Sequence, residues 1–221
     1  MITATTASVN AIVRFFITTM KKKTMEKKSR DIRQVRSITS DFKTRDDGEA
    51  KRIEGYFSVF NTIYEIAPDM TESVAEGAFS EALDGDVRAL IDHETMYVLG
   101  RNQAGTLELR EDDKGLWGSV LINPNDQDAM NLYSRVERGD VNQCSFGFDI
   151  LEEETEFLDD GSVHWTIKKV KLYEVSVCTF PAYAETSAEA RREDKEQIVK
   201  RQNEIWKKEM LEKLRGEETN A

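Results

Sequence analysis

The sequence has 221 residues, enough for one domain of ordinary size with flanking segments. It holds 42 Asp and Glu residues against 31 Lys and Arg, a formal net charge of −11. Such an acidic chain argues against unspecific nucleic-acid binding, because phosphates are bound by cationic surface. The two cysteines, Cys144 and Cys178, could form at most one disulfide, and no other feature of the sequence indicates an oxidising compartment. We therefore interpret both as reduced thiols in a cytosolic protein.

The N-terminal region predicts neither a membrane span nor a signal peptide. Its apolar run, residues 9–19, is too short to cross a bilayer and contains Arg14. The lysines follow this run, whereas in a signal peptide they precede it. Because Met20 and Met25 lie just downstream, we expect residues 1–24 to be an upstream extension with little structural role. We expect residues 1–50 as a whole to be largely disordered.

Ordered structure is expected to begin near Lys51. Aromatic and β-branched residues predict a strand over residues 52–60, in which Gly55 marks a bulge or a close backbone approach. Phe79 and Leu83, four residues apart, predict a short helix over residues 73–83. A short apolar run then predicts a buried strand over residues 87–91, with His93 just beyond it.

The second half of the sequence predicts four strands and two helices. A turn rich in acidic residues and glycine joins the first two strands, and Gly139 can end the first helix. The second helix is highly charged with a thin apolar stripe, so we expect it to bind a partner and to lie outside the folded domain of residues 51–186. The elements are strands 107–110, 116–122, 141–150 and 163–178, a helix over 125–138, and a helical tail within 187–221.

Metal-binding and nucleotide-binding motifs are missing from the sequence. The two histidines, His93 and His164, are far apart, and no CxxC or HExxH pattern accompanies them. Neither GxGxxG nor GxxxxGK[ST] occurs. We therefore expect no metal site and no cofactor.

Three residues are candidates for acyl-transfer chemistry. His93 follows a buried strand, where a rigid element can aim it into a cleft, and Ser145 lies in a strand close to Gly147, which permits close backbone approach. A serine becomes nucleophilic beside a base, and its oxyanion needs N–H donors. Glu174 interrupts an apolar strand and therefore needs a partner, either an imidazole or a nearby lysine. Taken alone, each residue also fits an ordinary structural position.

Seven segments in order resemble the tailed-phage prohead protease family. They cover residues 53–183, and their order is more specific than any one of them. The segments are Glu54-Gly-Tyr-Phe-Ser-Val-Phe-Asn61, Glu76-Gly-Ala-Phe79, Leu90-Ile-Asp-His93, Val98-Leu-Gly-Arg101, Gly115-Leu116, Cys144-Ser-Phe-Gly-Phe148 and Leu172-Tyr-Glu-Val-Ser-Val-Cys-Thr-Phe-Pro-Ala-Tyr183. The family often has Pro-Gly at the second segment and Asn-His at the third, so both loops depart mildly from it.

The resemblance implies an α+β fold, with a β-barrel-like core and surrounding helices as in the related herpesvirus capsid proteases. It implies a serine endopeptidase that cuts scaffold and major capsid protein segments inside the immature phage head, in the host cytoplasm. His93 would be the general base, Ser145 the nucleophile and Glu174 the orienting carboxylate, with Asp92 or Asp149 as alternatives to Glu174. The backbone near Phe146 and Gly147, with help from Arg101, would hold the oxyanion.

Two other interpretations stay open. The chain could be a non-catalytic capsid assembly factor whose helical tail binds shell or scaffold proteins or a second copy. It could also be a cysteine peptidase that uses Cys144. Because neighbouring residues of a strand point to opposite faces, Cys144 and Ser145 cannot both face His93. We expect neither nucleic acid nor membrane as a partner.

Overall fold

The computed structural model describes residues 33–46, 48, 50–180 and 184–218. The chain divides into two compact units, residues 1–182 and 183–221. The expected extension of residues 1–24 lies outside the described residues. No helix in the described part of the chain is long and apolar enough to cross a membrane.

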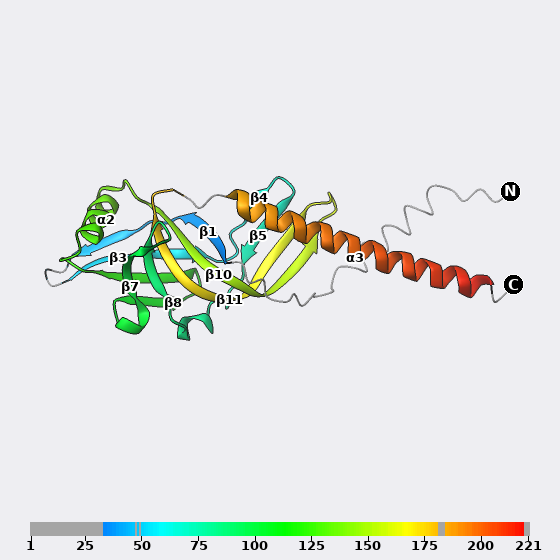
Figure 1. The fold of residues 1–221 in the computed structure, drawn as a ribbon, viewed down its shortest axis with the longest axis horizontal. Helices are drawn as coiled ribbons and strands as arrows, with labels where there is room; N and C mark the ends of the chain where they lie inside the picture. The colour runs from blue at the N-terminus through cyan, green and yellow to red at the C-terminus, as the bar shows by residue number, and fades with distance from the viewer. Residues whose placement is uncertain (1–32, 47, 49, 181–183, 219–221) are drawn as a thin grey trace. The chain divides into compact units, whose positions relative to one another are not determined.

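The first unit is built from two sheets (Figure 1). The larger one has the strand order β1-β10-β11-β5-β4, and β6 pairs with β11 and with β7. The smaller one has the order β2-β3-β9-β8. The strands are β1 Gln34–Thr39, β2 Lys43–Asp46, β3 Lys51–Val59, β4 Tyr64–Ala67, β5 Met70–Val74, β6 Arg88–Ile91, β7 Glu94–Arg101, β8 Leu107–Glu111, β9 Gly115–Ile122, β10 Gln143–Phe157 and β11 Val163–Cys178.

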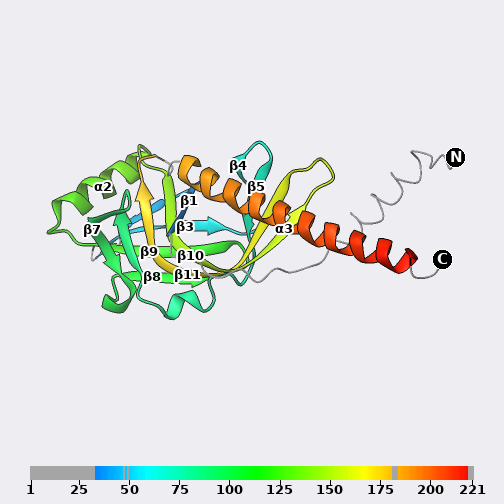
Figure 2. The ribbon, with the colours of Figure 1, turned by 45° about the vertical axis from the view of Figure 1, so that its right-hand side comes forward.

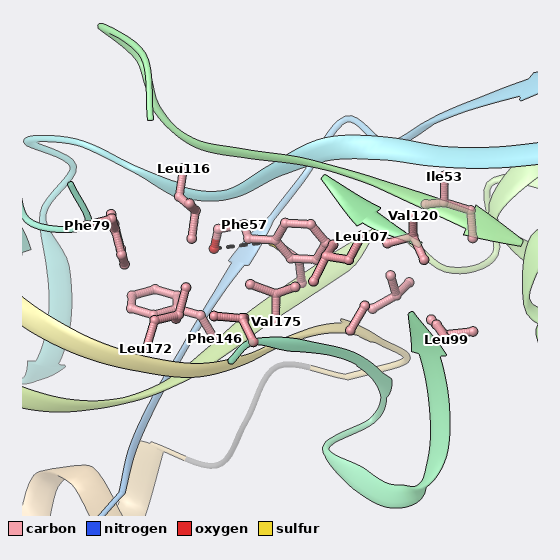
Figure 3. Close-up of a cluster of buried hydrophobic side chains, with 14 of the residues drawn as sticks. Ile53, Phe57, Phe79, Leu99, Leu107, Leu116, Val120, Phe146, Leu172 and Val175 are labelled. Carbon is pink, nitrogen blue, oxygen red and sulfur yellow. Dashed lines mark hydrogen bonds between the residues drawn. The ribbon is translucent and has the colours of Figure 1, made fainter. Parts of the chain in front are cut away.

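Side chains from both sheets meet in a common hydrophobic core. In Figure 3, Phe57 and Leu116 of the smaller sheet lie opposite Phe146 and Val175 of the larger one, and all four side chains are buried. Burying a side chain of this size stabilises the fold by about 1.5–3 kcal/mol relative to exposure. The core therefore fixes which face of β10 and β11 points inward.

The β10–β11 hairpin forms the centre of the larger sheet. The two strands pair antiparallel from Gln143 opposite Cys178 to Phe157 opposite Val163. Figures 1 and 2 show it running from the core to the end where β4 and β5 lie. The hairpin confirms the strands predicted at residues 141–150 and 163–178, although β10 continues beyond the predicted end to Phe157. It also brings Ser145 and Glu174 onto neighbouring strands.

The helices are few. The α2 helix, Gln127–Arg138, begins where Asp126 accepts hydrogen bonds from the backbone of Asp128 and Ala129, and it ends at Gly139 in the left-handed conformation (φ 85°). It packs against β2, β3 and β9. The second unit contains one long helix, α3, Ala184–Glu218. Both helices are confirmed in the structure, and so is the α+β class.

The helix expected at residues 73–83 is wrong. The chain continues as β5 to Val74, turns follow, and one 3₁₀ turn, Ala82–Asp84, is the helical part. Gly77 has a φ of +87°, and its backbone N–H and that of Phe79 donate to the Glu111 carboxylate. The Glu111 carboxylate, distant in sequence, thus accepts hydrogen bonds from backbone N–H groups that a helix would have paired internally. The spacing of Phe79 from Leu83 was too weak a signal against this contact.

Ordered structure begins earlier than the sequence predicts. The strands β1 and β2 both precede Lys51. The strand β1 depends on a partner distant in sequence, because it pairs with β10, whereas β2 pairs antiparallel with β3, the next strand in the chain. Strands of four or five residues carry little local signal, which also explains why β4 and β5 were not predicted. The longer β7 was not predicted either.

Candidate catalytic site

A two-residue turn between β6 and β7 positions His93. Asp92 and His93 both have positive φ, 47° and 64°, while Ile91 pairs with Glu94 on either side of them. Two successive left-handed residues between paired strands are typical of a type I′ hairpin turn. Aspartate tolerates this conformation well, so Asp92-His93 suits the turn.

The end of β11 holds this turn in place. The Asp92 backbone N–H donates to Val177 O at 3.1 Å, and the Asp92 carboxylate accepts from the N–H and hydroxyl of Thr179 at 2.7 and 3.0 Å. The His93 backbone N–H donates to Ser176 Oγ at 3.3 Å. The Asp92 carboxylate is therefore engaged in anchoring the turn.

The imidazole of His93 contacts Glu174. His93 Nδ1 lies 2.8 Å from Glu174 Oε1, and the glutamate is 2% exposed. An ionised carboxylate only accepts hydrogen bonds, so in neutral imidazole this contact places the proton on Nδ1 and leaves Nε2 as the basic nitrogen. Ser176 Oγ donates to the other carboxylate oxygen, Oε2, at 2.6 Å. The partner that Glu174 needed is thus the imidazole and not Lys169 or Lys171.

Gly147 leaves the space that this carboxylate occupies. Gly147 lies opposite Glu174 in the β10–β11 register. A Cβ built on Gly147 would come within 2.3 Å of Glu174 Oε1, far inside van der Waals contact. The glycine is therefore required by packing against the carboxylate.

Ser145 lies on the same face of the sheet. It pairs with Ser176 as Gly147 pairs with Glu174, and opposed residues of an antiparallel pair point to the same side. Ser145 is fully buried, and its Oγ donates to the backbone carbonyl of Arg36 on β1 at 2.8 Å. His93 Nε2 instead lies 3.8 Å from Cys178 Sγ. Among the described residues, no hydrogen bond joins Ser145 to His93.

Cys144 points to the opposite face, into the core. Its Sγ lies 3.1 Å from Tyr56 O and 3.6 Å from Ile38 O. Burial raises the pKa of this thiol to about 12, so it is not a thiolate at neutral pH. This geometry disfavours Cys144 as a nucleophile. Burial likewise raises the pKa of Cys178.

The expected oxyanion residues do not form a group in this structure. Phe146 packs against Phe79 in the core (Figure 3) and also against Phe148. Its strand β10 is paired on both sides, by β1 and β11. Its backbone N–H and that of Gly147 would have to leave the ladder to bind an oxyanion. Arg101 is held by Asp86 through two hydrogen bonds of 2.6 and 2.8 Å. Their oxyanion role stays a prediction.

Asp149, the other alternative acid, is also engaged elsewhere. Its carboxylate accepts from the hydroxyl of Tyr173. Glu174 is thus the carboxylate that contacts His93. In the described part of the chain, no cluster of three or more His, Cys, Asp or Glu side chains could hold a metal ion.

Sequence reasoning missed Ser176, which touches both Glu174 and the backbone of His93. A signal was present, because two residues at positions i and i+2 of a strand share a face. Glu174-Val-Ser176 in a predicted strand therefore placed a hydroxyl beside the candidate carboxylate.

Comparisons with known proteins find a matching family and similar chains. The model of the caudovirus prohead serine protease family matches residues 38–201. The prohead protease of Enterobacteria phage HK97 is 29% identical over 147 residues, which cover 65% of this chain and 61% of that relative. The solved capsid assembly protease of bacteriophage T4 aligns with a TM-score of 0.47 and 9% identity, over 66% of this chain and 96% of the other.

Proposed function

Because the chain belongs to the caudovirus prohead serine protease family, we propose that it is a serine endopeptidase of the immature phage head. Its substrates would be scaffold and major capsid protein segments, cut inside the prohead in the host cytoplasm. The observation that carries the proposal is the buried Glu174 bound to His93 on the sheet face that also bears Ser145.

The reaction would follow the logic of other serine peptidases. His93 Nε2 takes the Ser145 proton as Oγ attacks the scissile carbonyl, and the imidazolium then protonates the leaving amine. Water hydrolyses the acyl-enzyme with the same base. Glu174 keeps the Nδ1 proton in place and stabilises the imidazolium. No cofactor takes part in these steps.

The proposed reaction requires two side chains, Ser145 and His93, to rearrange. The Ser145 hydroxyl must turn from Arg36 O toward His93 Nε2, and Nε2 must turn from Cys178 Sγ. Catalytic hydrogen bonds are often unformed without substrate and tighten in the Michaelis complex. The described arrangement therefore fits an enzyme at rest.

The finer fold and domain expectations belong to the same proposal. We propose that the two sheets correspond to the β-barrel-like core of herpesvirus capsid proteases, although the described strands form two separate sheets. The protease domain would span residues 51–186, preceded by the extension 1–50, although β1 and β2 already lie in the sheets.

The helical tail, residues 187–221, would bind a second copy or a scaffold segment. Ile205, Trp206 and Leu211 of α3 are 40%, 46% and 57% exposed. An apolar stripe left exposed on a long helix favours a helical partner. In sedimentation experiments, a chain shortened to residue 186 should form a smaller oligomer than the full chain. The same number of subunits in both would contradict self-association through the tail.

A serine-reactive fluorophosphonate probe tests the peptidase proposal against a non-catalytic assembly role. The full chain is expected to be labelled at Ser145 and, when co-expressed with the neighbouring capsid gene, to remove a discrete piece of the major capsid protein. Ser145→Ala and His93→Ala should abolish cleavage, since such losses reach about 10⁶-fold in rate.

Two matched variants control for unfolding. Ser119→Ala removes another buried strand serine, and His164→Asn removes the other histidine. Both should leave labelling intact. A folded wild-type chain without labelling, or a Ser145→Ala variant that still cuts the capsid protein, would refute the assignment.

A further inference from the structure

We propose that Ser176 is a positioning residue that locks the acid and the base of the site into one unit. The inference rests on the proposed function, because it concerns the alignment of His93 for proton transfer. Ser176 was not among the residues that the sequence singled out.

The Ser176 hydroxyl uses both of its hydrogen-bonding capacities within the site. Its one proton is donated to Glu174 Oε2 at 2.6 Å, and its oxygen accepts the backbone N–H of His93 at 3.3 Å. A hydroxyl offers one donor and two acceptor lone pairs, so this donor is fully committed. Ser176 is thus joined to the side chain of the acid and to the main chain of the base.

The contact leaves the carboxylate little freedom. Glu174 Oε1 is bound by His93, Oε2 is bound by Ser176, and Gly147 lies against the carboxyl group. Without Ser176, Oε2 loses this donor and the carboxyl group can rotate about its terminal bond. That rotation moves Oε1 away from His93 Nδ1 and frees the imidazole.

The same hydroxyl anchors the turn that carries the base. Asp92 and His93 both hold left-handed backbone conformations between β6 and β7. The contact from His93 N to Ser176 Oγ adds to the Asp92 contacts with β11. Ser176 therefore restrains the position of the imidazole from its backbone as well as from its ring.

The smaller sheet offers a matched control. Ser119 is also a buried strand serine: its Oγ donates to Glu54 Oε1 at 3.0 Å and accepts from Arg52 at 3.2 Å. Replacing either serine by alanine removes the same atom and leaves a carboxylate without one donor. Ser119 lies on β9, away from His93 and Glu174. The Ser119→Ala variant therefore measures only the loss of stability that follows when a buried serine hydroxyl is removed.

The experiment compares Ser176→Ala, Ser176→Thr and Ser119→Ala in the full chain. Removing supporting partners of this kind at metal centres typically costs about 10- to 100-fold in affinity or activity, and we expect the same range here. For Ser176→Ala the loss should appear in kcat for capsid-protein cleavage and in the rate of fluorophosphonate labelling, with KM unchanged. Ser176→Thr should restore both rates, and Ser119→Ala should match wild type.

Nitrogen-edited proton NMR of the imidazoles gives a readout that does not depend on activity. The chain has two histidines, and His164 is bound on both ring nitrogens by Thr71 and Ser73. We expect a protected low-field Nδ1 proton for His93 in wild type and Ser119→Ala. In Ser176→Ala it should broaden or move upfield while the His164 signals stay in place.

The inference is overturned if Ser176→Ala keeps the wild-type kcat and the His93 signal, or if Ser119→Ala loses as much activity. If Ser176→Ala does not fold, Ser176→Thr decides: wild-type labelling supports the role, and lost labelling overturns it. A wild-type chain that is not labelled at Ser145 refutes the peptidase instead, while the His93 signal still tests the positioning by Ser176.

Discussion

A single methyl group added at Gly147 should displace Glu174 and thereby slow the reaction at Ser145. In Gly147→Ala the new Cβ would lie 2.3 Å from Glu174 Oε1, the atom that contacts His93 Nδ1. Carbon and oxygen atoms that are not bonded rarely approach closer than about 3.0–3.4 Å, so one of them must move by roughly 1 Å. Glu174 is the part that can yield, because Gly147 belongs to a strand paired on both sides.

The expected magnitude follows from that displacement. A shift of about 1 Å turns a hydrogen bond of 2.8 Å into a contact too long to orient the imidazole. Misplacing a catalytic group by this distance costs about 10²-fold in rate. Overpacking a buried position adds a stability cost of about 1–3 kcal/mol. The variant should thus be folded but slow.

The assay is the rate of fluorophosphonate labelling at Ser145, measured beside urea unfolding. Gly118→Ala is the matched control, since its Cβ would meet Phe57 at 2.7 Å in the core of the smaller sheet. That variant should lose stability without a specific loss of labelling rate. A Gly147→Ala variant that is labelled as fast as wild type would refute the idea that the glycine exists to accommodate Glu174.

Three further predictions concern single side chains. Glu174→Gln should slow cleavage by about 10²- to 10⁴-fold, whereas Asp92→Asn and Asp149→Asn should cost less; the reverse order in peptide-cleavage rates would mean that the acid was misassigned. Cys144→Ala should keep full labelling at Ser145, because its thiol is protonated in the core, and a loss of labelling in folded protein would contradict this. Burial lowers the pKa of His164 from its unfolded value of 6.5, so the unfolded state binds the proton more readily and the stability of the fold decreases as the pH drops below about 6.5. Between about pH 7.5 and 5.5, the urea concentration at the unfolding midpoint should therefore decrease less in His164→Asn than in wild type. An equal decrease in both proteins would exclude a contribution of His164 to the pH dependence of stability.

Local patterns in the sequence predicted the elements that carry their own signals. The α2 helix has its N-cap at Asp126 and its C-terminal glycine at Gly139, and both act within a few residues. The first half of β10 and most of β11 are rich in apolar residues, and a short turn joins the two strands. By contrast, β1 depends on β10, which is distant in the sequence, and its own residues predict nothing by themselves.

The candidate site divides in the same way. Glu174 could be singled out because a carboxylate in a buried strand requires a partner, and the structure supplies His93. The role of Gly147 depends on the register between β10 and β11, and the contact of Ser176 with His93 depends on the pairing of β6 with β11. Register follows from the whole hairpin, so the role of Gly147 could not be predicted from the local sequence, whereas the i, i+2 spacing of Glu174 and Ser176 was a local signal that went unused.

The hydrogen bond between Ser145, the proposed nucleophile, and β1 can account for only a small part of what would keep the proposed peptidase inactive. Ser145 Oγ donates to Arg36 O across 109 positions of sequence. A neutral hydrogen bond of this kind contributes about 0.5–1.5 kcal/mol net, which corresponds to roughly a tenfold effect on a rate at most. Breaking it therefore delays catalysis only slightly. The larger barrier is access, because Ser145 is fully buried and a scissile carbonyl must reach Oγ before any proton moves. Under the proposed function, the timing of activity should accordingly depend on what exposes Ser145 more than on what breaks its hydrogen bond to Arg36.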